Sequence, residues 1–150
     1  MTLEPLGELW ESHDGEPAFA VPSPDMDRFA LGIERGPDGS VVALTHGPSR
    51  YLAAGAPATP EADPPVGADQ VVGTFRNWNP WSPGFRVFVR AGRLWLASPS
   101  AEAPLTALRD GEWRLGDEHS PDRVAFDTIV NDRTQRAQYN AVSYARSFMD

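Results

Sequence analysis

The chain has 150 residues, a formal net charge of −8, and 41% hydrophobic and 23% charged side chains, values typical of one globular domain with a hydrophobic core. The negative charge argues against nucleic acid and an anionic membrane surface, so we expect neither as a partner. The sequence contains no cysteine and no lysine, which excludes disulfides, cysteine metal sites and lysine-dependent catalysis. The acidic start lacks the apolar core of a signal peptide, and we expect a cytoplasmic location.

Residues 1–52 are predicted to form an N-terminal arm and a β-hairpin. The hairpin strands are expected near residues 28–34 and 40–46, on either side of a Gly-Pro-Asp-Gly turn sequence. Tight pairing around that turn places His46 at the rim of an apolar face. A rim histidine is either solvated or available as a ligand-binding or acid–base group. Because a lone hairpin is marginally stable, we expect it to join or cover the barrel described below, or to pair with another chain.

Residues 53–68 are rich in proline and alanine and are interpreted as an exposed linker. Residues 69–150 are predicted to form a β-meander, because short strand patterns alternate with turn sequences. The turn sequences include Ala91-Gly92, Asp110-Gly111 and Asn131-Asp132. Together with the N-terminal pair, they predict a single all-β domain, an antiparallel barrel of about eight to ten strands without a long helix.

The same turns predict cross-strand pairs, which give an independent check on the register. Strands that meet at these turns place opposite charges or apolar side chains opposite each other. The predicted pairs are Arg109 with Glu112, Leu108 with Trp113, Asp127 with Arg136, and Val124 with Tyr139.

The hairpin around Ala91-Gly92 has two apolar faces. One face is assigned to the barrel core, and its members are Phe85, Val87, Val89, Leu94 and Leu96. The other face pairs Phe88 with Trp95 and adds arginines, among them Arg86. Three interpretations fit this second face: an arginine-over-aromatic stack covered by the N-terminal arm or the linker, a protein interface, and a ligand site in which arginine holds an anionic group.

The sequence Asn-Trp-Asn-Pro-Trp at residues 77–81 is a second aromatic feature. We expect Trp78 and Trp81 to cap one end of the barrel by packing against it. The alternative is that both indoles shape an entrance at the barrel mouth, with the two asparagines as hydrogen-bonding groups.

The sequence contains no recognisable nucleophile motif, phosphate-binding loop or metal-ligand spacing, and we expect neither a metal nor a cofactor. Acid–base catalysis in a water-poor barrel would draw on Asp127, Tyr139, Tyr144 or a histidine. Asp127 also has a purely structural interpretation as the ion-pair partner of Arg136. The sequence therefore leaves open whether the protein is an enzyme.

Several short motifs resemble one known family. They are Val72-Gly73-Thr74-Phe75, Phe85-Arg86-Val87-Phe88, Gly92-Arg93-Leu94-Trp95-Leu96, Asp122-Arg123-Val124-Ala125-Phe126 and Tyr144-Ala145-Arg146-Ser147-Phe148. In these motifs the chain resembles the lipocalin-like C-terminal β-barrel domain appended to serine β-lactamase-like hydrolases, the class C and penicillin-binding-protein-related esterases. Residues 29–47 resemble the last strand pair of the preceding hydrolase domain. The Ser-x-x-Lys and Tyr-x-Asn motifs of that family have no counterpart here, so the resemblance does not imply acyl-enzyme chemistry.

The sequence thus predicts a lipocalin-like barrel that binds a small apolar or anionic molecule in a mainly apolar pocket. The residues expected to bind it are His46, Trp78, Trp81, Arg86, Phe88, Trp95 and Tyr144. One alternative is a barrel enzyme of a biosynthetic pathway, such as a cyclase, isomerase or small hydrolase. The other is a protein-interaction module that pairs through the Phe88–Trp95 face or the hairpin edge, and a homodimer is among the expected partners.

Overall fold

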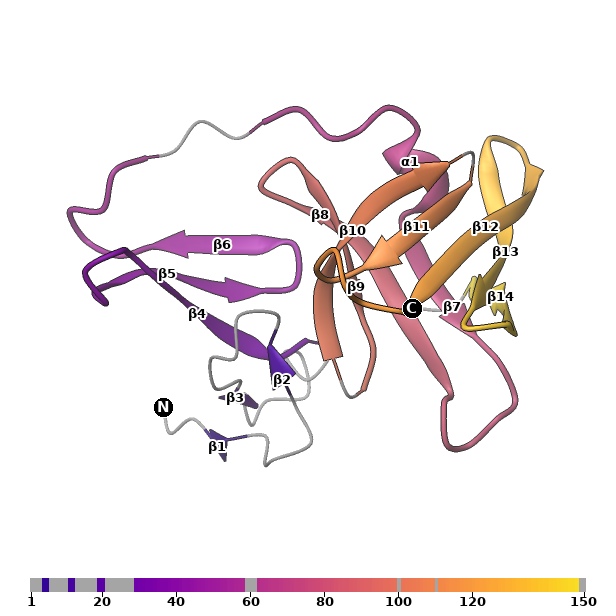
Figure 1. Cartoon of the computed structure of the whole chain (residues 1–150), viewed down its shortest axis with the longest axis horizontal. Helices are drawn as coiled ribbons and strands as arrows, with labels where there is room; N and C mark the ends of the chain where they lie inside the picture. Colours follow the sequence, from indigo (N-terminus) through magenta and orange to yellow (C-terminus); the bar gives the residue numbers. More distant parts are fainter. Residues whose placement is uncertain are drawn as a thin grey trace.

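The computed structural model describes residues 4–5, 11–12, 19–20, 29–58, 62–99, 101–109 and 111–148. These residues form two sheets, a small N-terminal sheet and a closed barrel beside it (Figure 1). The strand order of the N-terminal sheet is β1 (Glu4–Pro5), β3 (Phe19–Ala20), β4 (Leu31–Arg35), β5 (Val41–His46) and β6 (Ser49–Leu52). A connection that starts after β6 leads to the barrel and ends in the short helix α1 (Ala68–Val71).

Eight antiparallel strands close the barrel. Their order is β11 (Glu112–Leu115), β12 (Arg123–Val130), β13 (Arg133–Tyr139), β14 (Val142–Arg146), β7 (Gly73–Arg76), β8 (Gly84–Arg90), β9 (Arg93–Ala97) and β10 (Ala101–Arg109). β10 also pairs with β11, and this pairing closes the circle, while β2 (Glu11–Ser12) adds to β10 in parallel. The prediction of an all-β antiparallel barrel is confirmed. No helix of the described residues is long and apolar enough to cross a membrane.

Tight two-residue turns set the register of the barrel. Both central residues have positive φ at Ala91-Gly92 (48° and 71°) and at Asn131-Asp132 (50° and 57°). Positive φ at both positions matches the right-handed twist of the flanking strands. The predicted pairs across these turns are confirmed: Phe88 with Trp95, Asp127 with Arg136, and Val124 with Tyr139.

One predicted pair is wrong. Trp113 pairs with Ala107 and not with Leu108, because β10 has an irregularity between Ala107 and Arg109. The predicted pair of Arg109 with Glu112 is present beside the turn. The extra residue turns Leu108 toward solvent, where its side chain is 41% exposed. A β-bulge of this kind shifts the pairing by one residue and cannot be read from alternation alone.

Two elements of the fold were not predicted. Within residues 69–150, a short helix precedes the first barrel strand: Val71 belongs to α1 and packs into the core, and β7 begins at Gly73. The sequence analysis also missed β6, which pairs with β5 across the short turn at Gly47-Pro48. The N-terminal hairpin is therefore extended to a three-strand meander, β4–β5–β6.

The barrel interior is filled by packed side chains. Phe75 stacks on Phe85 with ring centroids 5.4 Å apart, and Phe75 also contacts Phe126 at 5.6 Å. The aliphatic face of the β8–β9 hairpin joins this core through Val87 and Leu94, as predicted. Other buried members are Leu96, Ala103, Leu105, Leu115, Val124, Ala137 and Tyr144.

Arg146 closes the barrel at the end where α1 lies. Its guanidinium donates to the backbone carbonyl oxygens of Thr134, Val72 and Gln70, the last two at 2.8 Å each. It also lies 5.0 Å from the ring centroid of Phe75. Burial lowers the pKa of Arg146 from its usual value. A Cβ at Gly73 would overlap the Arg146 guanidinium, so this close approach requires glycine.

Candidate functional site

Trp78 and Trp81 lie on the β7–β8 loop at one end of the barrel, and both side chains face solvent. Their relative exposures are 102% and 93%. The interpretation that these indoles cap the barrel by packing is therefore wrong. Two large aromatic side chains exposed on one loop make that loop a candidate binding surface.

The loop keeps its shape through its own backbone and asparagine side chains. Asn77 Oδ1 accepts a hydrogen bond from the Asn79 amide at 2.8 Å, and Asn79 Oδ1 accepts one from the Trp81 amide at 3.0 Å. These are Asx turns, for which asparagine is well suited. The Asn77 amide also donates to the Pro83 carbonyl oxygen at 3.1 Å. Because these bonds fix the loop, its conformation does not require the indoles to be buried.

Ser82 and Tyr144 connect this loop to the barrel interior. Ser82 Oγ and the Tyr144 hydroxyl share a hydrogen bond at 2.8 Å. The Tyr144 residue is 2% exposed, and its ring lies edge-on to Phe85 at a centroid distance of 5.0 Å. Tyr144 is thus a buried support of the loop. Ser82 was not among the predicted site residues, because a serine beside a proline in a loop gives no distinctive signal.

Tyr139 lies near the same end of the barrel. Its ring centroid is 5.6 Å from that of Phe85. Burial is the main cause that raises the pKa of Tyr139 to about 12, and the negative charge of the nearby Asp122 carboxylate adds to it. A phenol with this pKa stays protonated near neutral pH and serves as a hydrogen-bond donor rather than as a general base.

The other four predicted residues meet where the N-terminal sheet contacts the outer face of the β8–β9 hairpin. Phe29, which precedes β4, lies 5.1 Å from Phe88 and 5.8 Å from His46 between ring centroids. The Arg86 guanidinium lies 5.5 Å from the Phe29 ring centroid. Trp95 pairs directly with Phe88 on the same face. The face is therefore a covered arginine–aromatic stack, and among the described residues Phe29 and His46 contribute to its cover.

A buried ion pair completes this junction. Arg90 Nη1 donates to Glu102 Oε1 at 2.6 Å and to the Gly47 carbonyl oxygen at 3.1 Å. The Arg90 guanidinium carbon lies 3.9 Å from the Trp95 ring centroid. Burial raises the pKa of Glu102, while the charges of Arg90 and His46 oppose this rise. The sequence analysis missed Glu102, because a single glutamate in an alanine-rich strand carries no motif.

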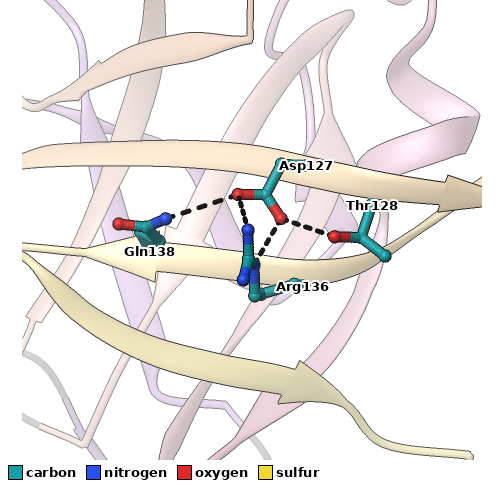
Figure 2. Close-up of polar contacts among 4 residues, drawn as sticks. All are labelled: Asp127, Thr128, Arg136 and Gln138. Atoms are coloured by element: carbon teal, nitrogen blue, oxygen red, sulfur yellow. Dashed lines mark hydrogen bonds and ion pairs between the residues drawn. The ribbon is translucent and has the colours of Figure 1, made fainter.

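Asp127 lies on the outside of the barrel and is held by its neighbours, as Figure 2 shows. Arg136 Nε donates to Asp127 Oδ1 at 2.6 Å and Arg136 Nη2 donates to Oδ2 at 2.9 Å. Thr128 Oγ1 adds a hydrogen bond at 2.9 Å, and Gln138 adds a longer one at 3.4 Å. The Arg136 hydrogen bond is the main cause that lowers the pKa of Asp127. This arrangement is a surface ion pair, in agreement with the structural interpretation of Asp127.

The predicted ligand residues thus occupy two separate places, the tryptophan loop with its Tyr144 support and the covered junction. Among the described residues, no group of three or more histidine or acidic side chains is arranged to hold a metal ion. Comparison with protein-family models, curated proteins and solved structures found no match to this chain.

Proposed function

We propose that the protein is an interaction module whose barrel presents Trp78 and Trp81 to a partner protein. The observation that carries this proposal is the full exposure of both indoles on one loop. Tryptophan is among the residues that contribute most to binding energy when buried at protein interfaces. Each indole would bury about 150–250 Å² on a partner.

The rigidity of the loop supports the same proposal. The Asx turns at Asn77 and Asn79 and the Ser82–Tyr144 bond hold the loop before any partner arrives. A loop that is already ordered loses little conformational entropy on binding, so more of the contact energy contributes to affinity.

The composition of the barrel interior favours recognition on the outer surface. Phe75 packs against both Phe85 and Phe126 in the barrel core, in the space that a lumen-bound ligand would need. The covered junction is likewise occupied by side chains of the chain itself, with Phe29 against Phe88. Of the two clusters of predicted ligand residues, the tryptophan loop is the one whose aromatic side chains are open to a partner.

The resemblance to an appended barrel of serine β-lactamase-like hydrolases suggests a first partner to test. In this proposal, the lipocalin-like barrel docks through Trp78 and Trp81 on a hydrolase catalytic domain of that family. The barrel then contributes binding and positioning, while the catalytic groups belong to the partner.

Site-specific photocrosslinking in the host organism tests the proposal. A photoreactive amino acid replaces Trp81 in the full-length chain, and a matched chain carries it at Phe148, an exposed aromatic position outside the loop. We expect a discrete crosslinked partner from position 81 that position 148 does not give. Crosslinks of equal pattern and intensity from both positions would contradict a role of the loop.

A binding titration with the purified partner follows. The variant Trp78→Ala/Trp81→Ala is expected to bind at least about 30-fold more weakly, since a hot-spot residue contributes 2 kcal/mol or more. Phe148→Ala is the control and should bind like the wild type. Both variants should unfold at the wild-type denaturant concentration, because exposed side chains contribute little to stability.

A further inference from the structure

The N-terminal sheet ends in an edge strand that lies on a different surface from the tryptophan loop. In the part of the chain that the structure describes, β6 pairs with β5 and has no neighbour on its other side. Figure 1 shows β6 as the outer strand of the β4–β5–β6 meander. An unpaired edge presents a row of backbone donors and acceptors that favours pairing with another strand.

The backbone groups that point outward are identified by the pairing with β5. The Ala53 amide donates to the Val42 carbonyl oxygen, so the backbone of Ala53 faces β5. Because strand positions alternate, Tyr51 also faces β5, whereas the backbone groups of Arg50 and Leu52 point away from it. These two residues supply the hydrogen-bonding capacity of the edge.

β6 lacks the usual protection of an edge strand. It contains no proline or lysine, and its one charged residue, Arg50, is bound to Glu34 by an ion pair at 2.8 Å. This ion pair reaches across β5 and holds the Arg50 charge over the sheet. The exposed apolar side chains are Tyr51, which is 55% exposed, Leu52, and Leu44 directly opposite Tyr51 on β5.

We propose that β6 is a self-association edge, at which it pairs antiparallel with β6 of a second copy around a twofold axis at Tyr51. A twofold axis perpendicular to the sheet leaves the same face of both copies on the same side of the joined sheet. A residue of one copy must therefore pair with the same residue of the second copy, or with a residue an even number of positions away. Centring on Arg50 would place two arginines opposite each other, which is unfavourable. Centring on Tyr51 avoids this and uses the whole of β6.

This register is complementary in hydrogen bonds and in side chains. Arg50 of one copy faces Leu52 of the other, and both present outward backbone groups, so each such pair exchanges both of its hydrogen bonds. Tyr51 meets Tyr51 of the second copy at a non-hydrogen-bonded position, where side chains approach most closely. Leu44 and Tyr51 of both copies then form one continuous apolar stripe. This complementarity with itself favours a second copy over an unrelated extended peptide.

Disulfide trapping tests the register directly, because the chain has no other cysteine. Cα atoms of a non-hydrogen-bonded antiparallel pair are about 4.5 Å apart, within the range that a disulfide spans. Full-length Tyr51→Cys should therefore form a covalent dimer under mild oxidation at least about tenfold faster than the control Val66→Cys, at an exposed position of the linker. Equal rates for the two variants would overturn the proposal.

Sedimentation equilibrium of the full-length protein gives a second, independent measurement. The wild type and Tyr51→Phe should show a monomer–dimer equilibrium, whereas Tyr51→Lys, which places two like charges on the axis, should associate at least about tenfold more weakly. Circular dichroism checks that each variant is folded. A wild type that stays monomeric at all accessible concentrations, or a dimer unaffected by Tyr51→Lys, would overturn the proposal. The proposal would also be overturned if the protein stayed monomeric and a bound peptide protected the backbone amides of Arg50 and Leu52 from hydrogen exchange.

Discussion

The guanidinium of Arg90 stacks on the ring of Trp95, while the same side chain binds the carboxylate of Glu102 and the carbonyl oxygen of Gly47. Trp95 and Glu102 belong to the barrel, whereas Gly47 belongs to the turn that follows β5. One arginine therefore joins the two sheets. A buried charge with partners on both sides makes this junction sensitive to single substitutions.

Replacing Arg90 should destabilise the protein strongly. Arg90→Met keeps much of the apolar stem but leaves the Glu102 carboxylate buried without its cation, and we expect a loss of about 3–5 kcal/mol in the free energy of unfolding. The double variant Arg90→Met/Glu102→Gln should lose less, because no charge is then left buried. Urea unfolding of both variants measures the difference. Equal losses would show that the ion pair does not govern the stability of the junction.

Glu102 should also make the stability of the protein depend on pH. Burial raises the pKa of Glu102 in the folded state above the ordinary value of 4.5. The folded protein therefore binds this proton more tightly than the unfolded chain does, and the resulting stability is fully present below pH 4.5. It is lost as the pH rises through the raised folded-state pKa.

The matched variant for this measurement is Glu102→Gln, which cannot titrate. The unfolding free energy of the wild type minus that of Glu102→Gln should be larger near about pH 4 than near about pH 7. Urea unfolding at both pH values provides the comparison. A difference that stays constant or rises with pH would mean that burial does not raise the Glu102 pKa.

Loss of the Arg146 guanidinium should open the barrel at the α1 end. Arg146→Met removes the donors to Thr134, Val72 and Gln70 but keeps an apolar stem against Phe75. Because buried carbonyl groups without partners cost about 1–3 kcal/mol each, we expect a loss of roughly 3 kcal/mol or more. Hydrogen exchange should show the greatest loss of protection in β7 and β14. Unchanged protection of both strands would count against this role.

A bare protein mass is expected in native mass spectrometry of the chain purified from its own host. The reason is that Phe75, Phe85 and Phe126 belong to a cluster of buried, packed side chains in the barrel core. The competing hypothesis is the function predicted first from the sequence, and this alternative is binding of a small molecule in the barrel, with or without catalysis. A retained small molecule of defined mass would favour that alternative and would argue against the packed interior as the reason for surface recognition.

The barrel could be predicted because short turn sequences determine how neighbouring strands pair. Turns such as Asn131-Asp132 fix the pairing of adjacent strands, and the pair of Asp127 with Arg136 follows from that turn alone. The prediction failed at Leu108 because a bulge adds one residue without changing the hydrophobic pattern. Local rules are therefore sufficient for most of the register, except where a strand is irregular.

The two clusters of candidate residues could be predicted only in part. Phe88 and Trp95 were recognised as neighbours from the turn between them, but their cover, Phe29, is distant in sequence and carries no matching signal. Trp78 and Trp81 lie on a loop whose backbone is held by the side chains of Asn77 and Asn79, and both indoles are exposed. Whether an indole packs on the barrel or points away from it depends on tertiary geometry. The sequence therefore left two alternatives for this loop, packing against the barrel and an entrance at its mouth.

Arg146 has a consequence for biosynthesis. It bonds the carbonyl oxygens of Gln70 and Val72, which are 76 and 74 residues earlier in the chain. During translation, β7 and α1 leave the ribosome long before the residue that fastens them. The barrel therefore closes only after Arg146 has been made, and a message truncated shortly before codon 146 would yield an open sheet with two unpaired edges, which proteases and aggregation would remove.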